Sequence, residues 1–404
     1  MTNSNKILST TVVVSALGYF VDIYDLILFS IVRIPSLKAI GVPSEELLGT
    51  GVFLLNMQMF GMLLGGILWG VFGDKRGRVS VLFGSIFLYS AANIANGFVQ
   101  SVPMYGALRL LAGIGLAGEL GAAITLVSET LSKEKRGYGT TIVASVGILG
   151  AVAAAWVGDY FDWRVAYFVG GAMGLALLVM RVSMFESGMF EGCKQAGVRR
   201  GDFTVLFRSL RHFKRYASCI LIGVPVWYVI GILITFSPEL STEMGVTGPI
   251  QASLAVMWSY IGLAAGDVAS GFLSQWLRTR KRVVLGFLSL TAVLTCVYVY
   301  VKGWTPFEFY GLCAALGFAV GYWAVFVTVA AEHFGTNLRS TVTTSTPNFV
   351  RGSVVVLTLA FQSLRQSQPL LQSALIVGIV ALAAAFLGLR GLDETYGKEL
   401  DYVD

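Results

Sequence analysis

The sequence predicts an all-α membrane protein with twelve transmembrane helices, arranged as two six-helix bundles related by pseudo-two-fold symmetry. Three observations lead to this fold class. The 404 residues are 55% hydrophobic and only 13% charged, whereas soluble domains carry roughly a quarter charged residues. Apolar runs of about 20 residues or more, enough to cross a bilayer as a helix, recur from end to end. The second half of the chain also repeats features of the first.

The expected spans are the apolar runs between short polar gaps. In order they cover 8–32, 47–73, 78–98, 103–129, 138–160, 164–184, 214–240, 248–276, 282–301, 305–332, 339–364 and 369–390. Each is expected to be an α-helix, because lipid cannot satisfy the open backbone groups of other structures. The first run is too long for a signal peptide and shows no small-residue cleavage site, so we keep it as a span.

The longest polar gap divides the chain into three parts. We expect an N-terminal bundle over 1–184, a cytoplasmic linker over 185–213 and a C-terminal bundle over 214–404. This division places six spans on each side of the linker.

The halves resemble each other in their charged residues. Glu129 and Arg136 lie seven residues apart after span four, and Glu332 and Arg339 have the same spacing after span ten, 203 residues later. Parallel repeats of this kind are related by an axis along the membrane normal, and alternating access rocks one half against the other around a site at mid-membrane.

The basic residues predict the orientation. With the N-terminus on the cytoplasmic side, 22 of the 29 Lys and Arg residues face the cytoplasm, five face outward, and Arg109 and Arg351 lie inside spans. Such a bias is typical of a multi-pass protein of a bacterial inner (plasma) membrane with both termini cytoplasmic. The net charge of +6 is therefore a topology signal and gives no reason to expect nucleic-acid binding.

Residues that could hold a cofactor are scarce. The four Cys have no metal-binding spacing, and two His are too few for a His-based metal site. The Gly-rich stretches lie inside apolar helices and form no nucleotide-binding motif. We expect no cofactor, no metal and a monomer in the lipid bilayer.

The loop between spans two and three carries a specific motif. Residues 70–79 read GVFGDKRGRV, which resembles the G-x-x-x-D-[RK]-x-G-R-[RK] signature of the major facilitator superfamily. Arg109, Gly113 and Gly115 fit that superfamily's R-x-x-x-G-x-G pattern on span four, and Trp163-Arg164 opens span six as in its members. Val79 departs from the signature, which usually has a basic residue there.

Charges at the cytoplasmic ends of the spans suggest a latch. Gly70 would let a helix of the other half approach closely, and Asp74 could pair with a facing helix N-terminus or with Arg136. We expect this contact to form when the inner side closes and to break when it opens. The predicted gating set is Gly70, Asp74, Arg78, Glu129, Arg136, Glu332 and Arg339. The alternative is that these charges only fix topology.

Ionisable groups inside spans are expensive and point to function. Asp22 and Asp25 lie three residues apart at mid-depth on span one, so they should share a helix face. Span four carries Arg109 in its outer half and Glu119 near its middle. We interpret these four residues as proton-coupling groups: Asp25 stays ionised beside Arg109 and takes a proton when Arg109 moves away. A structural polar cluster is the alternative.

Further motifs narrow the resemblance. Residues 118–123, GELGAA, and the spacing from Glu129 to Arg136-Gly137 resemble the metabolite:proton symporters within the superfamily. The resemblance implies a carboxylate substrate, such as citrate, oxoglutarate, shikimate, proline, betaine or an aromatic acid. Phe185-Glu186-Ser187 is similar to an E-S-P element of that group, with Gly188 in place of Pro.

Arg351 on span eleven is the candidate for binding an anionic substrate, because its planar fork suits a carboxylate or phosphate. An ion pair with Asp267 of span eight is the rival interpretation. Polar and aromatic residues at similar depth could complete the site: Asn348, Gln58, Tyr228, Trp258, Tyr322 and Trp323, with Asn56, Trp227 and Tyr260 as further candidates.

The sequence thus predicts a proton-coupled symporter of a small organic anion that works by alternating access. Proton-coupled efflux of a drug or metabolite is the alternative, as is transport of phosphate, a metal chelate or a sugar. A membrane enzyme is disfavoured because Glu332-His333, at a cytoplasmic helix end, is the only acid–His neighbour pair. The paired halves and the latch also argue against a receptor or channel.

Overall fold

The computed structural model describes residues 9–131, 133–181 and 204–398. The first half contains α1 (Thr10–Ala39), η2 (Ser44–Glu46), α2 (Leu47–Arg76), α3 (Arg78–Asn96), α4 (Val102–Leu116), α5 (Glu119–Thr130), α6 (Lys133–Tyr160) and α7 (Trp163–Met180). The second half contains α9 (Val205–Arg208), α10 (Leu210–Tyr228), η4 (Val229–Ile234), α11 (Ser237–Met244), α12 (Ala252–Trp276), α13 (Lys281–Tyr300), α14 (Pro306–Ala319), α15 (Trp323–Glu332), α16 (Thr336–Leu364) and α17 (Leu370–Arg390). Within these described ranges the regular structure is entirely helical, as the sequence predicts.

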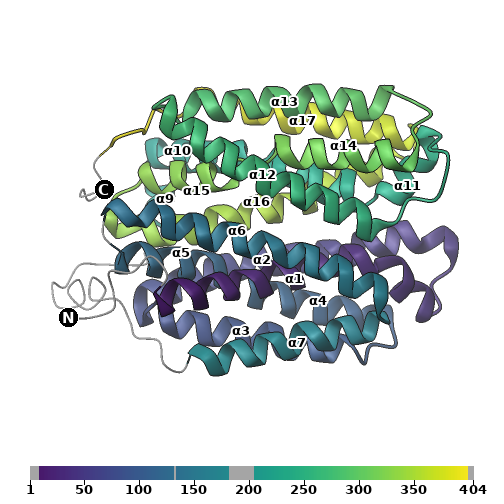
Figure 1. Cartoon of the computed structure of the whole chain (residues 1–404), viewed down its shortest axis with the longest axis horizontal. Coiled ribbons are helices and arrows are strands. Elements are labelled where there is room, and N and C mark those ends of the chain that lie inside the picture. Colours follow the sequence, from purple (N-terminus) through teal and green to yellow (C-terminus); the bar gives the residue numbers. More distant parts are fainter. Residues whose placement is uncertain (1–8, 132, 182–203, 399–404) are drawn as a thin grey trace.

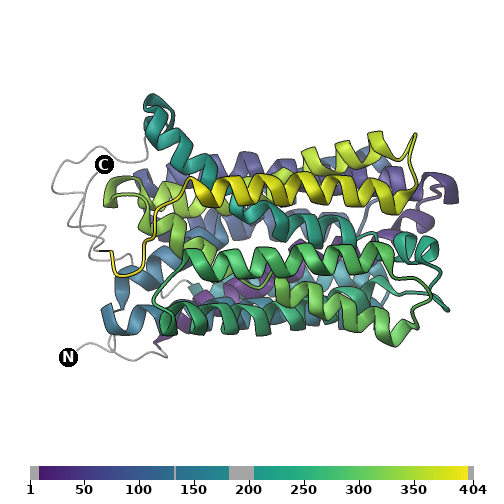
Figure 2. The same ribbon diagram turned by 90° about the horizontal axis from the view of Figure 1, so that it is seen from above.

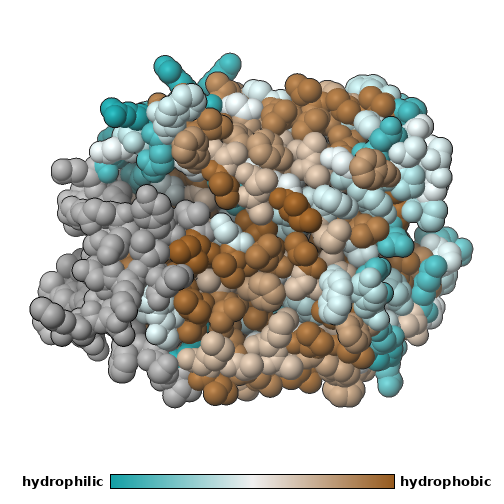
Figure 3. All heavy atoms as spheres, in the orientation of Figure 1, coloured by the Kyte–Doolittle hydropathy of each residue, from teal (hydrophilic) through white to brown (hydrophobic). Residues whose placement is uncertain are grey.

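Among the described residues, eleven stretches are long and apolar enough to cross a membrane. The predicted span over 339–364 also forms a long helix, α16, but its Thr- and Ser-rich first half makes it less apolar than the others. Figure 3 shows hydrophobic side chains across the middle of one face and hydrophilic ones toward its ends. The chain is therefore a multi-pass membrane protein.

The helices form two bundles that lie against each other (Figure 1). Helices α1 to α7 group together, α10 to α17 form the second group, and the long helices run roughly parallel to one another in both views (Figure 2). The main contacts between the halves join α2 to α16 and α6 to α12, and α1 also touches α12. The centre of the molecule is thus bounded by helices from both halves.

Three spans are interrupted. The fourth breaks between α4 and α5, and the tenth breaks between α14 and α15. Adding the repeat offset of 203 to Leu116, the end of α4, gives Ala319, the end of α14, so both halves break at the same point. The seventh span changes from α10 to the π-helix η4 and then to α11. Such π-helical turns often mark functional positions in helices.

The break in the tenth span explains the partner of Asp267. Its carboxylate accepts a hydrogen bond of 3.1 Å from the backbone N–H of Ala324, in the first turn of α15. A helix N-terminus leaves several N–H groups unpaired and favours a negative charge there. Asp267 therefore caps a half-helix, and the ion pair with Arg351 that we considered as the rival interpretation does not form.

Candidate functional site

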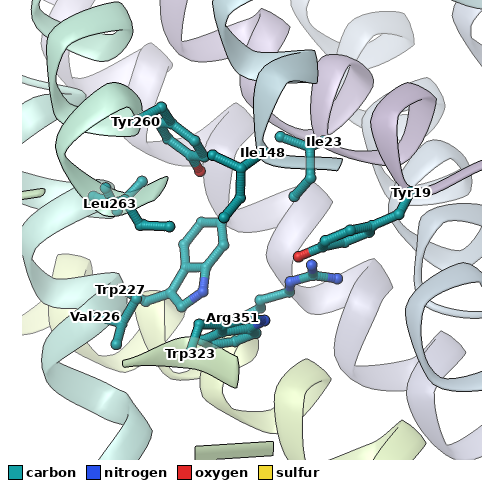
Figure 4. Close-up of a pocket in the computed structure, with 10 residues that line it drawn as sticks. Tyr19, Ile23, Ile148, Val226, Trp227, Tyr260, Leu263, Trp323 and Arg351 are labelled. Atoms are coloured by element: carbon teal, nitrogen blue, oxygen red, sulfur yellow. The ribbon is translucent and has the colours of Figure 1, made fainter. Parts of the chain in front are cut away.

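A small cavity lies between the two halves near the middle of the molecule (Figure 4). Its free volume is about 30 Å³, too small for an organic acid with the side chains as they stand. The lining comes from seven helical segments and consists of Tyr19, Ile23, Ile148, Val226, Trp227, Ile230, Tyr260, Leu263, Trp323 and Arg351. The lining is thus mainly apolar and aromatic, with one charged group.

Arg351 supplies the charge of this cavity. Its side chain is only 1% exposed, and its guanidinium lies 6.0 Å from the ring centre of Trp227 and 5.8 Å from that of Trp323. Figure 4 shows the guanidinium beside the Tyr19 ring. Indole faces favour a cation electrostatically. The two Trp rings therefore provide favourable contacts for the buried guanidinium.

The Arg351 guanidinium contacts two polar side chains. Its Nη2 lies 3.7 Å from Asp22 Oδ2, and its Nη1 donates a long hydrogen bond of 3.5 Å to Asn348 Oδ1. Asn348 in turn donates to the carbonyls of Ala117 and Thr344, both at 2.8 Å. Because Asp22 is on α1 and Arg351 is on α16, this ion pair joins the two halves. It is looser than a hydrogen-bonded pair, whose N–O distance is about 2.7–2.9 Å.

Asp22 and Asp25 face different neighbours, although their spacing predicts a shared face. Asp22 points to Arg351, whereas Asp25 lies against Gly170 of α7 inside the first bundle. Both carboxylates are fully buried, and neither oxygen of Asp25 has a hydrogen-bond partner among the described residues. A separation of three residues turns the helix by about 300°, so the two side chains diverge by about 60°, enough to reach different helices.

Arg109 lies close enough to Asp25 for electrostatic attraction, but the two form no ion pair in this conformation. Its guanidinium instead donates to the side chain of Gln58 and lies 4.9 Å from the ring centre of Phe29. Gln58 is held by a second bond, from its amide nitrogen to the carbonyl of Leu26. Gln58, predicted as a substrate ligand, is therefore a partner of Arg109 in the first bundle.

Glu119 forms a buried ion pair that the sequence did not indicate. Arg181, which the sequence assigns only to the cytoplasmic excess of basic residues, donates hydrogen bonds to both carboxylate oxygens, and its Nη1 lies 3.0 Å from Oε2. The side chains of Glu119 and Arg181 are 0% and 1% exposed. Gly18 of α1 gives them room, because a Cβ there would overlap both groups. The pair links α5 to the C-terminal end of α7.

A second ion pair joins the halves near the C-terminal end of α1. Arg33 of α1 is fully buried, and its Nη2 lies 2.6 Å from Glu239 Oε1 on α11. Ser30 and Thr235 share a hydrogen bond of 3.1 Å one turn deeper, and Arg33 lies 5.0 Å from the ring centre of Phe236. These contacts close the molecule between the C-terminal end of α1 and the interrupted seventh span, at the end that the distribution of basic residues predicts to face outward. The sequence places Arg33 only among the five basic residues expected to face outward and does not predict this ion pair.

Polar contacts between other pairs of helices add to this closure. Thr358 of α16 donates to Asn56 of α2 at 2.6 Å, and Ser253 of α12 donates to Asp159 of α6 at 3.2 Å. Both pairs cross from one half to the other. Asn56, named above as a further pocket candidate, therefore belongs to the contact between α2 and α16.

Only part of the predicted latch can be compared with the structure. The side chains of Asp74, Arg78, Glu129, Arg136 and Arg339 lie outside the described residues. Gly70 does face the other half, since a Cβ there would lie 3.8 Å from Thr344 Cβ, an ordinary contact. The closest approaches are nearby, at Gly66 against Asn348 and at Gly121 against Thr344.

Glu332, the gating residue described in the second half, belongs to a polar cluster at the C-terminal end of α15. It lies 3.3 Å from Arg280 and accepts a hydrogen bond from Thr395. Glu394 nearby is partly buried, which by itself would raise the pKa of its carboxyl. Hydrogen bonds from Thr279 and from the backbone N–H groups of residues 280, 281 and 396 outweigh this effect and lower the pKa of Glu394 to about 2. The cluster holds Glu394 and Thr395, which follow α17, against the loop after α12 and the end of α15.

Several predicted pocket residues lie elsewhere in this conformation. The hydroxyl of Tyr228 donates to Ala374 on α17, and that of Tyr322 donates to Ile222 on α10. Trp258 is 40% exposed on the outside of its bundle. Of the predicted substrate residues, Arg351 and Trp323 line the cavity, and Asn348 contacts Arg351.

The sequence reasoning missed one polar residue of the cavity. Tyr19 precedes Asp22 by three residues on α1, and this spacing could have indicated it. Trp227 and Tyr260, which we named as further candidates, do line the cavity.

Comparisons with known proteins also indicate a membrane transporter. The sequence profile of the Major Facilitator Superfamily matches residues 10–357. The chain is 27% identical to a probable 4-methylmuconolactone transporter of Cupriavidus pinatubonensis, over 80% of this chain and 76% of that protein. It is 26% identical to the niacin transporter NiaP of Acinetobacter baylyi, over 71% and 72%. Among solved structures, the proton:xylose symporter XylE bound to 6-bromo-6-deoxy-D-glucose has the same fold, with a TM-score of 0.75, 16% identity and 97% of each chain covered.

Proposed function

Because the chain belongs to the Major Facilitator Superfamily, we propose that it is a secondary active transporter that couples the uptake of a small organic acid to protons. The observation that carries this proposal is the buried ion pair between Arg351 and Asp22 in a cavity bounded by both halves. The preferred substrate is an aromatic or otherwise unsaturated monocarboxylate.

The cavity supports this class of substrate in two ways. Arg351 is the one cation that lines it, so it can receive one carboxylate, and a guanidinium binds a carboxylate through two parallel hydrogen bonds. Trp227, Trp323, Tyr19 and Tyr260 offer flat apolar surfaces for a ring. The relative named as a niacin transporter handles such a molecule, since niacin is an aromatic ring with one carboxylate.

Exchange of partners on Arg351 provides a route to coupling. At 3.7 Å, Asp22 holds the guanidinium loosely, so a substrate carboxylate that makes two short bonds can replace it. Asp22 is fully buried, and a buried carboxylate without a cation is stable only when protonated. Binding of the anion therefore favours uptake of a proton by Asp22. Asp25, with Arg109 beside it, is the second proton-carrying group of this proposal.

Alternating access follows from the contacts between the halves. The pairs Arg33–Glu239 and Ser30–Thr235 close the outer side, and they must separate for substrate to reach the cavity from outside. We propose that the gating residues around Gly70 and Asp74 close the cytoplasmic side in the same way when the outer side opens. We place the protein in a bacterial inner membrane as a monomer, with both termini cytoplasmic and with bundles over 1–184 and 214–404 joined by the linker 185–213.

The test is uptake by the purified protein in proteoliposomes. A panel of radiolabelled acids (nicotinate, benzoate, shikimate and citrate) is supplied with and without an alkaline interior. We expect accumulation of a monocarboxylate only when the pH gradient is imposed, and loss of this accumulation in Arg351→Ala. Trp258→Phe, on the outside of the bundle, is the control. Accumulation that ignores the gradient removes the proton role, and failure of every acid removes the substrate class.

A further inference from the structure

The first bundle contains a stripe of buried polar residues that the substrate cavity does not use. Tyr89, Asn93 and Asn96 follow one another along α3 at spacings of four and three residues, so they share a face. All three are 0% exposed. The Tyr89 hydroxyl and both polar atoms of each Asn amide have no hydrogen-bond partner among the described residues. We call these residues the α3 stripe.

The α3 stripe faces the interior of the first bundle. Its helix packs against α7 and α4, and Figure 1 shows α3 beside α7 on the side of the molecule away from the second bundle. Two glycines let the neighbouring helices approach here: a Cβ at Gly115 would overlap the backbone of Tyr89, and a Cβ at Gly174 would overlap Ser90 Oγ and lie 3.0 Å from the Tyr89 ring. No residue of α3, α4 or α7 lines the cavity around Arg351. The stripe is therefore separated from the substrate cavity by α1.

The stripe connects groups that can carry a proton. Asn93 lies beside the carboxylate of Asp25, close enough to affect its charge. The Tyr89 hydroxyl lies within electrostatic range of both Asp25 and Glu119. Asn96, the last residue of α3, is at the outer end of its span. Asn96, Asn93, Asp25, Tyr89 and Glu119 thus form a series from the outer end of the bundle to the buried pair with Arg181 on the cytoplasmic side.

Packing alone does not account for such a stripe. Each buried polar group without a partner costs about 1–3 kcal/mol, so apolar side chains would hold α3 in place at a lower cost. Buried groups of this kind usually bind internal water, each molecule making about three hydrogen bonds. A hydroxyl can donate and accept at once, so Tyr89 can pass a proton on without becoming charged.

We propose that the α3 stripe is a hydrated proton path through the first bundle, separate from the path of the substrate. A proton from the outer side passes along water held by Asn96 and Asn93 to the carboxylate of Asp25. From Asp25 it moves through internal water to the Tyr89 oxygen, as Tyr89 gives its own proton, again through water, to Glu119. Glu119 releases it to the cytoplasmic side and pairs with Arg181 again. The proposal rests on the proton coupling put forward above. It adds a route for the proton carried by Asp25, the second proton-carrying group, and leaves the exchange at Asp22 as the step linked to substrate binding.

The path is tested with variants that keep the size of the side chain but remove its ability to pass a proton. The readouts in proteoliposomes are accumulation driven by a pH gradient and counterflow, in which labelled substrate exchanges for unlabelled substrate without net proton movement. The substrate is the best-transported acid of the panel above. We expect Tyr89→Phe and Asn93→Leu to lower gradient-driven accumulation by about 100-fold or more, the range for loss of a proton-transfer group, while counterflow persists.

Matched variants separate the path from general damage. Tyr298→Phe removes a buried hydroxyl of the second bundle, which bonds the Leu233 carbonyl, and should leave both readouts at the wild-type level. Asn93→Ser keeps a polar group with room for water, so it should retain coupling that Asn93→Leu loses, and the same holds for Ser and Leu at Asn96.

The outcomes distinguish the two proposals. If the wild-type protein ignores the pH gradient, proton coupling itself is wrong. If the wild-type protein responds and the Leu variants at Asn93 and Asn96 accumulate substrate as well as their Ser counterparts, the path is wrong while proton-coupled transport stands.

Discussion

The outer ion pair between Arg33 and Glu239 gives a quantitative prediction for Glu239→Gln. Breaking a buried ion pair costs about 3–5 kcal/mol. Glu239 is 21% exposed, and Gln still offers Arg33 an oxygen, so we take about 2 kcal/mol as the loss to the outward-closed state. A loss of about 2 kcal/mol changes the equilibrium constant between the closed and open states about 30-fold. If about 1% of the molecules are outward-open in the wild type, about a quarter are outward-open in Glu239→Gln.

The assay is a distance measurement across the outer opening. Lys38 at the end of α1 and Gln368 after α16 are both exposed and belong to different halves, so Cys at these positions can carry spin labels for pulsed EPR. We expect Glu239→Gln to add a longer distance to the distribution. The control is Glu243→Gln on the same helix, because Glu243 bonds the backbone N–H of Leu371 within the second half. An unchanged distribution in Glu239→Gln, or an equal shift in the control, would refute the reasoning.

Three further predictions concern other charged groups. Arg351→Lys loses the planar fork and with it about one charge-assisted hydrogen bond, so KM for the acid should rise about 10–150-fold; an unchanged KM in uptake assays speaks against carboxylate binding by Arg351. Glu119→Gln leaves Arg181 buried without its partner and should lower the melting temperature by at least about 5 °C, which a thermal unfolding scan checks against wild type; equal melting temperatures contradict the pair's role in stability. The pKa of Glu394 falls from 4.5 to about 2 on folding, so its contribution to stability is complete above about pH 4.5 and is lost as the pH falls toward 2. Glu394→Gln should therefore flatten the pH dependence of the free energy of unfolding in that range. An unaltered pH profile would show that the contacts of Glu394 contribute nothing to stability.

The sequence predicts the spans well because the bilayer imposes a length and an apolar composition on each one. The repeat was also accessible, and its offset of 203 residues reappears in the breaks after Leu116 and Ala319. The breaks themselves were not predicted. They lie inside the runs 103–129 and 305–332, each of which was predicted as one continuous span.

The sequence does not predict which charged residues form ion pairs with each other. Arg33 and Glu239 are 206 residues apart, and Arg181 and Glu119 are 62 apart, so only the tertiary arrangement brings them together. The two buried Asp residues of α1 show the same limit, because a 60° difference in direction decides between Arg351 and the interior of the first bundle.

The position of Trp258 shows a signal that was available but not used. Trp258, Ile261, Val268 and Phe272 are all exposed and recur at helical spacings along α12, which marks the lipid-facing side of that helix. Had this stripe been recognised, Trp258 would have been assigned to lipid contact and Tyr260 to the interior.

Proton uptake on substrate binding tests the central claim most directly. Isothermal titration calorimetry of the purified protein with its transported acid, in two buffers with different ionisation enthalpies, gives the number of protons bound per substrate. Exchange of Asp22 for the substrate carboxylate on Arg351 predicts uptake of close to one proton by the wild-type protein and none by Asp22→Asn. Equal proton uptake by both proteins, or binding without any proton uptake by the wild type, would contradict it.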